Sequence, residues 1–237
     1  MHHFGRGLVS TPGNFGAMGT RPTHPKLLDW LASEFMKSGW SLKHLHRVIL
    51  TSTAYRQSAR RREKLDQIDP DNQLLGRMSV RRLEAETLRD SLIHLGGRFS
   101  DRMFGPPVPV SLDSVGHRII VSNNRYDSTG RLLTKIASIG SEDFRRTIYI
   151  QVRRSMPLGV LTPFDPPTKK PNCEVRTAST TAPQSLMMMN DPFVVRHVGE
   201  LARRVRTEAS DGPAAEFDLA WRLVFGRGPS DFEQRTG

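Results

Sequence analysis

Five of the eight histidines lie in the first fifth of the chain, and clustered imidazoles could bind a zinc ion: His2, His3, His24, His44 and His46. His44 and His46 are two residues apart in a stretch with helical periodicity, so they are turned by about 200° around the helix axis and point to opposite sides. The chain contains neither H-E-x-x-H nor C-x-x-C-H, the motifs of zinc proteases and of haem attachment. We therefore expect no metal site and no cofactor in this chain. A structural role is favoured, with His24 at a helix start and His44 or His46 hydrogen-bonded beneath the N-terminal loop.

Paired carboxylates are the next candidates, because glycosidases place two of them across one cleft. Asp29 with Glu34, and Glu84 with Glu86, are candidate acid/base pairs within helical stretches. Acidic residues at such positions usually form the solvated face of an amphipathic helix. Hydrolytic chemistry is therefore disfavoured.

No activated nucleophile is evident. Ser155 and Ser185 lack the G-x-S-x-G context of a nucleophile elbow, and no glycine-rich nucleotide motif follows a strand. Cys173 is the only cysteine, so it cannot form an internal disulfide, and no neighbouring group activates it. We expect Cys173 to be buried as a small apolar residue.

Composition indicates a globular protein with a basic surface. The chain has 237 residues, 37% of them hydrophobic, and a net charge of +11. No apolar run approaches the ~20 residues that a membrane-spanning helix needs, and no signal-peptide segment follows Met1. Clustered cations favour nucleic acid, but here the basic pairs are scattered. They lie at 60–62, 81–82, 145–146, 153–154, 169–170 and 203–204. We expect a solvated basic surface or a docking face for an acidic partner, and nucleic-acid binding is the less favoured alternative.

The elements that would position these residues are mainly helices. Thr23 or His24 can cap a first helix that has Pro25 in its first turn, Gly39 can end it, and Ser41 can cap the next. Trp40 is expected to fold back on the first of these two helices. These signals predict a helical hairpin.

Periodicity and turn residues predict the remaining elements. Helices are expected over 72–78, 82–99, 183–189, 192–207 and 213–225, and two paired strands over 118–122 and 147–152. Residues 123–130 are expected to form a polar loop, and 156–172 an extended or turning segment. The methionines at 187–189 are expected to fill the core, with a ligand or partner groove as the alternative. Ser230 and Glu233 form a capping box that starts another helix close to the last residue, so we expect a fragment of a longer protein.

These expectations define a mainly α, multi-helix domain with a small β element around residues 118–152. We expect a single domain over 1–237. Its parts are an irregular N-terminal loop (1–22), the hairpin with further helices (23–99), an irregular region with short strands (100–172) and truncated C-terminal helices (173–237).

Five stretches carry a resemblance to a known family, and they occur in its order: FGRGLVSTPGNFGAMGTRPTHPKLLDWLASEF at 4–35, GWSLKHLHRVILTSTAYRQS at 39–58, DPDNQLLGRMSVRRLEAETLRDSL at 69–92, RRTIYIQVRRSMPL at 145–158 and STTAPQSLMMMNDPFV at 179–194. The chain resembles the C-terminal domain of unknown function, DUF number 1553, of large planctomycete-type proteins. An Asn-Arg-x-Trp-like helix that normally precedes His2 is missing, in agreement with truncation.

The resemblance implies a larger exported protein, periplasmic or in the cell envelope, with cytochrome-c-like and other uncharacterised domains upstream and any haem in that upstream part. It implies no catalytic residue. We therefore expect a non-catalytic structural or interaction module that contacts the other domains of its parent, an acidic protein or a polysaccharide. The enzymatic alternative is a cleft that gathers candidate residues around a sugar or an electron-transfer partner. Those candidates are His24, His44, His46, Arg153, Arg154 and Asp191.

Overall fold

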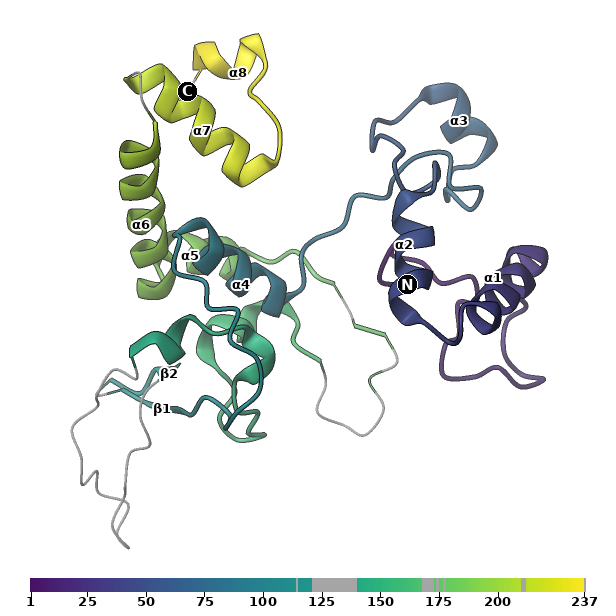
Figure 1. The fold of residues 1–237 in the computed structure, drawn as a ribbon, viewed down its shortest axis with the longest axis horizontal. Helices are drawn as coiled ribbons and strands as arrows, with labels where there is room; N and C mark the ends of the chain where they lie inside the picture. The colour runs from purple at the N-terminus through teal and green to yellow at the C-terminus, as the bar shows by residue number, and fades with distance from the viewer. Residues whose placement is uncertain are drawn as a thin grey trace, which may run out of the picture. The chain divides into compact units, whose positions relative to one another are not determined.

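The computed structural model describes residues 1–113, 115–120, 140–167, 173, 175–176, 178–209 and 212–236. The chain divides into two compact units, Met1–Arg82 and Leu83–Gly237. Helices dominate both units, and the second also contains a two-stranded sheet (Figure 1). This confirms the prediction of a mainly α fold with a small β element. Among the described helices, none combines the length and the apolar character needed to cross a membrane.

The first unit contains the predicted hairpin. Its helices are α1 (Pro25–Lys37), α2 (Leu42–Thr51) and α3 (Glu63–Ile68). Between α1 and α2, Gly39 has φ +70°, and the Trp40 ring packs edge-on against Phe35 with 5.3 Å between ring centroids. The Ser41 hydroxyl then accepts a hydrogen bond from the His44 N–H at 3.3 Å. The chain reversal is confirmed, although His24 stands at the N-cap of α1 without a capping hydrogen bond from its side chain.

The prediction of a helix over 72–78 is wrong, because the Asn72 side chain forms hydrogen bonds with backbone groups of this segment. The Asn72 amide donates to the Arg77 carbonyl at 2.8 Å and accepts from the Arg77 N–H at 3.2 Å. Asn72 and Leu75 both have positive φ, which a right-handed helix does not allow. The helix of this region is α3, which the sequence did not predict because its stretch is mostly polar.

The second unit contains the remaining helices and the sheet. Its elements are α4 (Ala85–Leu95), β1 (Val110–Leu112), β2 (Arg118–Ile120), α5 (Ala182–Asn190), α6 (Pro192–Glu208), α7 (Pro213–Phe225) and α8 (Asp231–Thr236). Helix α6 packs against α4, α5 and α7. Three 3₁₀ helices connect these parts: Gly140–Phe144, Thr147–Tyr149 and Gly159–Phe164. The last one lies within the segment that was expected to be extended or turning.

Caps fix the ends of the C-terminal helices where the sequence predicted them. The Asp191 carboxylate accepts from the Phe193 N–H at 2.8 Å at the start of α6. The Ser230 and Glu233 side chains bond each other's N–H groups before α8, at 3.4 and 2.7 Å. The predicted helices over 183–189, 192–207 and 213–225 are confirmed to within one residue at each end.

The strand predicted over 147–152 is wrong, and so is its pairing with 118–122. β2 pairs antiparallel with β1, with Val110 opposite Ile120, and residues 121–122 lie outside the described residues. Thr147 instead begins a 3₁₀ turn, because the Asp90 carboxylate accepts bonds from both its N–H and its hydroxyl. Ile150 forms an isolated bridge with Val108. Ile148, whose alternation with Ile150 predicts that both face one side of a strand, is 74% exposed.

The core of the second unit centres on four apolar residues, Val108, Val110, Ile150 and Leu158. Several burial predictions fail. Val198 on α6 is 51% exposed, although its helical spacing from Val194 and Leu201 predicts an inward position, and Cys173 is exposed where a buried residue was expected. The methionines at 187–189 are only partly buried, and Met189 is exposed. The loop predicted over 123–130 lies outside the described residues.

Candidate functional site

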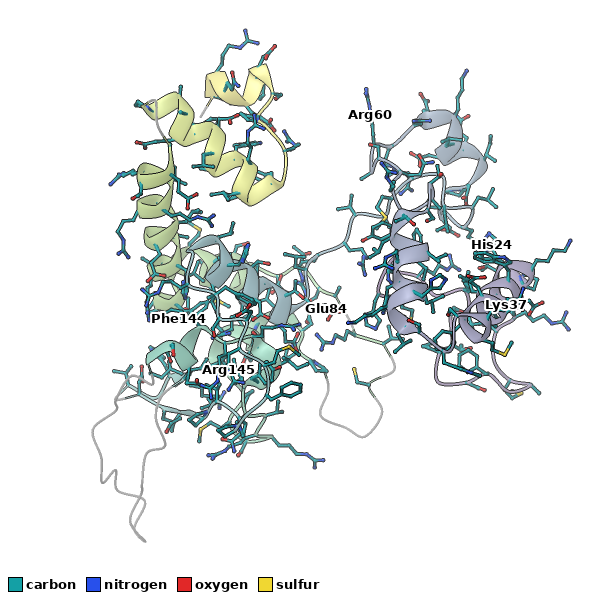
Figure 2. All side chains as sticks on the ribbon, viewed as in Figure 1. His24, Lys37, Arg60, Glu84, Phe144 and Arg145 are labelled. Atoms are coloured by element: carbon teal, nitrogen blue, oxygen red, sulfur yellow. The ribbon has the colours of Figure 1, made fainter. Side chains whose placement is uncertain are left out.

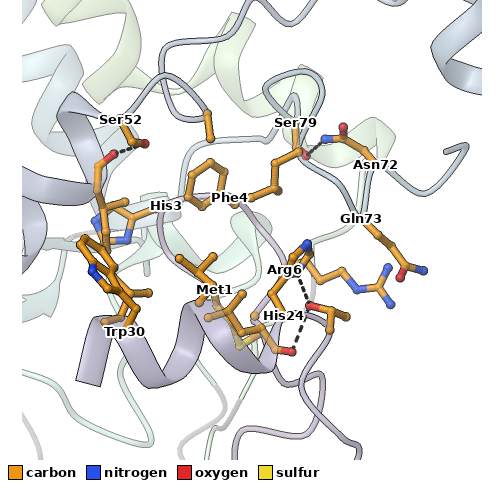
Figure 3. A pocket seen from close by; sticks show the side chains of 18 of the residues that line it. Met1, His3, Phe4, Arg6, His24, Trp30, Ser52, Asn72, Gln73 and Ser79 are labelled. Atoms are coloured by element: carbon orange, nitrogen blue, oxygen red, sulfur yellow. Dashed lines mark hydrogen bonds between the residues drawn. The ribbon is translucent and has the colours of Figure 1, made fainter. Parts of the chain in front are cut away.

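A pocket of about 320 Å³ lies in the first unit (Figure 3). The N-terminal loop, α1, α2 and the 71–79 turns form its walls. Most of the lining is aromatic or aliphatic: Met1, Phe4, Leu8, Leu27, Trp30, Leu31, Val48, Ile49, Ala54 and Leu75. Ligand sites commonly have this volume and apolar character, so the pocket is the candidate site of this unit.

Polar groups lie on both sides of the pocket. Figure 3 shows Arg6, His24 and Gln73 on one side, and His3 and Ser52 on the other side with Trp30. The His24 Nδ1 is 2.9 Å from the Thr23 hydroxyl, which holds the imidazole in place. The Arg6 guanidinium has no ion-pair partner among the described residues and is exposed. It is therefore available to an anion at the pocket.

The histidines of the first unit have separate partners. His44 Nε2 is 2.9 Å from a Glu34 oxygen, whereas His46 Nδ1 is 3.0 Å from His3 Nε2 in the N-terminal loop. Burial, followed by the charge of His46, lowers the pKa of His3. His44 and His46 thus bond different groups, as their spacing predicts, and His46 is the histidine held to the N-terminal loop. His24 and His3 line the pocket, whereas His44 and His46 do not. Within the described ranges, no three His, Cys, Asp or Glu side chains are grouped as metal ligands would be.

The other candidates lie in the second unit. Arg153 and Arg154 are exposed, and Asp191 caps α6 through its hydrogen bond to the Phe193 N–H. Asp191 thus has a structural role that accounts for its position. The enzymatic hypothesis joins these three residues to histidines of the other unit and stays a prediction.

Three of the four acidic candidates have basic side chains as partners. Glu34 binds His44, and both Glu84 and Glu86 contact the Arg176 guanidinium, at 3.1 and 2.6 Å. The hydrogen bonds that Arg176 donates to Glu86 raise the pKa of Arg176. Glu34, Glu84 and Glu86 thus each contact a basic side chain.

Sequence reasoning missed a buried polar cluster in the second unit, made of Arg89, Arg145 and Thr147 (Figure 2 labels Arg145). Arg89 Nη1 donates to the Arg145 carbonyl at 3.0 Å and to the Thr147 hydroxyl at 3.2 Å. Arg145 in turn donates to the Phe104 and Pro106 carbonyls. One signal was available: Arg89 stands four residues after Ala85 and four before Ile93, and both of these are buried.

Charge is unevenly divided between the units. Met1–Arg82 contains 14 Lys and Arg against 6 Asp and Glu, so it carries +8 of the chain's +11. Its exposed cations without an ion pair among the described residues are Arg6, Arg21, Lys26, Lys37, Lys43, Arg47, Arg56, Arg60, Arg62 and Lys64. Figure 2 shows Lys37 and Arg60 extending away from the ribbon.

Comparison with curated proteins gives no match, and neither does comparison with solved structures. One family model does match, and it covers residues 1–237. Its description is PSD1, protein of unknown function, DUF1553, the family that the five sequence stretches resemble. The chain therefore belongs to the DUF1553 family.

Proposed function

We propose that this chain is a non-catalytic interaction module that docks an acidic partner through its first unit. The observation that carries the proposal is the +8 charge of that unit. Electrostatic complementarity of this kind accelerates encounter and selects partners of opposite charge.

The acids of the first unit do not neutralise its surface, because several are engaged locally. Asp66 binds Arg61 and Arg77 at 2.9 and 3.2 Å, and these bonds lower the pKa of Asp66. Asp69 accepts the N–H groups of residues 73 and 74. The exposed cations that have no ion pair among the described residues extend over α1, α2 and the segment before α3, so a partner with carboxylates meets a wide basic surface.

The setting of the module follows from the family resemblance and belongs to the same proposal. The chain would be one part of a larger exported protein in the cell envelope, beside cytochrome-c-like domains that hold any haem. Its acidic partner would then be a neighbouring domain, a separate protein or an anionic polysaccharide.

A binding experiment with three anionic probes tests the docking proposal. We expect the 237-residue chain to bind a glutamate-rich peptide at low salt, with affinity that falls as salt rises. Polyuronate and duplex DNA serve as the other probes. Preference for DNA at physiological salt would favour nucleic-acid binding and contradict the proposal, whereas retention on DNA that disappears near that salt reflects general basicity.

Matched charge reversals locate the surface. Arg21→Glu, Lys43→Glu and Arg47→Glu together should weaken peptide binding about tenfold or more, because they remove cations of the first unit. The control combines Arg118→Glu, Arg146→Glu and Arg206→Glu, which make the same change in net charge on exposed arginines of the second unit. Equal losses in both triple variants would show that net charge, not the first unit, determines binding.

The enzymatic alternative has a separate test. Alanine substitution of His24, Arg153 and Arg154 should leave turnover of every substrate of the full-length parent unchanged. A loss of turnover without a loss of folding would instead establish the catalytic alternative.

A further inference from the structure

We infer that the pocket of the first unit binds a single large apolar side chain, aromatic or aliphatic, from the same acidic partner. This inference rests on the proposed docking function and specifies the ligand: an acidic peptide segment with one apolar anchor residue. Charge alone gives weak, salt-sensitive association, whereas specific interfaces depend on a few side chains buried in pockets near their centre.

The size and lining of the pocket fit such an anchor. A cavity of about 320 Å³ can accommodate one tryptophan, phenylalanine or leucine side chain. Leu27, Leu31, Val48 and Ile49 face it from the two helices of the hairpin. Burying a side chain of this size against such walls removes apolar surface from water on both partners.

Trp30 gives the pocket an exposed aromatic wall. Its side chain is 52% exposed although it lines the cavity, and Figure 3 shows it across the pocket from Arg6 and His24. An indole in this position offers a face or edge to an incoming ring, and aromatic pairs contribute beyond their buried area.

The charges near the pocket favour acidic residues on both sides of the anchor in the ligand sequence. Arg6 lines the cavity, while Lys26 and Arg47 directly precede the lining residues Leu27 and Val48. All three cations lack an ion pair among the described residues. Carboxylates next to an anchor would meet these cations. Asp71 also lines the cavity, so it disfavours a ligand carboxylate at its own position.

A peptide fits these observations better than a small carboxylate. A small molecule in the cavity would engage Arg6 and the other polar groups of the pocket only. The unpaired cations continue along both helices beyond the lining, at Lys37, Lys43 and Arg47. A chain with carboxylates on both sides of its anchor reaches them, and its multiple contacts make the affinity depend on salt.

Two peptides that differ in one residue test the inference. Both are short glutamate-rich peptides with blocked ends, and one has a central tryptophan where the other has alanine. We expect the tryptophan peptide to bind the 237-residue chain about tenfold more tightly, with the ratio retained as salt weakens both. Equal binding would overturn the pocket inference and leave the docking proposal standing. Failure of both peptides at low salt would overturn the two together.

A matched pair of variants places the preference in the pocket. Trp30→Ala should reduce the tryptophan-over-alanine ratio to less than about threefold, because it removes one wall. Phe15→Ala is the control, since Phe15 is 76% exposed in the same unit and does not line the pocket. Circular dichroism checks that both variants fold. An unchanged ratio in Trp30→Ala would assign the preference to another surface and overturn the inference.

Discussion

Arg89 and Arg145 are each 1% exposed, a rare state for a guanidinium. Carbonyl oxygens provide most of the compensation. Arg89 donates to the carbonyls of Asp143 and Arg145, and its Nη1 is 3.6 Å from an Asp90 oxygen. Burial lowers the pKa of Arg89 to about 10, which leaves it charged at neutral pH. Each arginine therefore donates hydrogen bonds to backbone carbonyls that are distant in sequence. The cluster connects α4 with the 143–147 segment.

Removing the Arg89 cation should strongly destabilise the second unit. Arg89→Met removes the buried cation beside Asp90 and the donors to the Asp143 and Arg145 carbonyls, so we expect a loss of about 3–5 kcal/mol in the free energy of unfolding. Urea denaturation measures it. The control is Arg102→Met, whose exposed guanidinium pairs with Glu142 at 2.6 Å and should contribute less than about 1 kcal/mol. Similar losses in the two variants would contradict a special role for the buried cation.

His197 is a buried titratable residue on α6. Its ring packs against Phe193 with 4.4 Å between centroids, and its Nδ1 is 3.2 Å from a Glu200 oxygen. The geometry of that contact is not that of a hydrogen bond. Burial lowers the pKa of His197, and the nearby Arg196 and Arg89 lower it further, while Glu200 opposes them.

Stability should therefore fall as the pH decreases below 6.5, the imidazole pKa of the unfolded chain. Because the folded-state pKa is lower, the unfolded chain binds the proton first, and the loss continues until the pH reaches the folded-state value. Unfolding free energies measured between pH 7 and about pH 5 should show this slope, and His197→Gln should flatten it. NMR titration gives an independent measurement. A His197 resonance that titrates above 6.5 would reverse the sign of the prediction.

Two glycines show how one residue type has opposite effects in different elements. Gly39 follows α1 with φ +70°, whereas Gly199 lies within α6 without a positive φ. A Cβ at either position would meet no atom within 4 Å. The effect of a methyl group therefore depends on the backbone conformation and not on packing.

Alanine substitution should separate the two positions. Gly39→Ala places a Cβ in the left-handed region and should destabilise the hairpin by about 1–2 kcal/mol. Gly199→Ala should stabilise the second unit by about 0.5–1 kcal/mol, because alanine loses less conformational entropy in a helix. Thermal unfolding of the two variants beside the parent chain measures both changes. Destabilisation by both substitutions would show that side-chain packing, not φ, limits these sites.

At the scale of the whole molecule, the chain has two compact units with different charge. The first carries most of the net charge and the apolar pocket, and the second contains the buried arginine cluster and the four-residue apolar core. Trp30 and Trp40 belong to the first unit, and Trp221 belongs to the second. The tryptophans therefore report on the two units separately.

We expect two unfolding transitions. In a Trp221→Phe variant, fluorescence follows the first unit, and in a Trp30→Phe, Trp40→Phe variant it follows the second. Denaturation midpoints should differ, and Arg89→Met should shift only the second. Coincident transitions that move together would show one cooperative domain, which is the single-domain prediction made from the sequence.

The sequence alone determined the hairpin and the C-terminal helices with their ends. The hairpin, the cap at Asp191 and the capping box before α8 depend on contacts between residues a few positions apart, so the local sequence contains their physical cause. His44 and His46 were also separated correctly, because helical geometry fixes the angle between them. The sequence also showed the scattered basic residues. It did not show that most of the net charge lies in one compact unit.

The tertiary structure decided what depends on distant residues. Thr147 does not begin a strand, because its backbone N–H donates to the Asp90 carboxylate. Arg89 can be buried because it donates to carbonyls more than fifty positions later in the chain. The pocket is lined by both the N-terminal loop and residues 71–79. Val198 and Ile148 have apolar side chains at positions that periodicity assigns to the core, yet they are exposed. Periodicity describes one element at a time, whereas burial is set by the elements that the rest of the chain places against it.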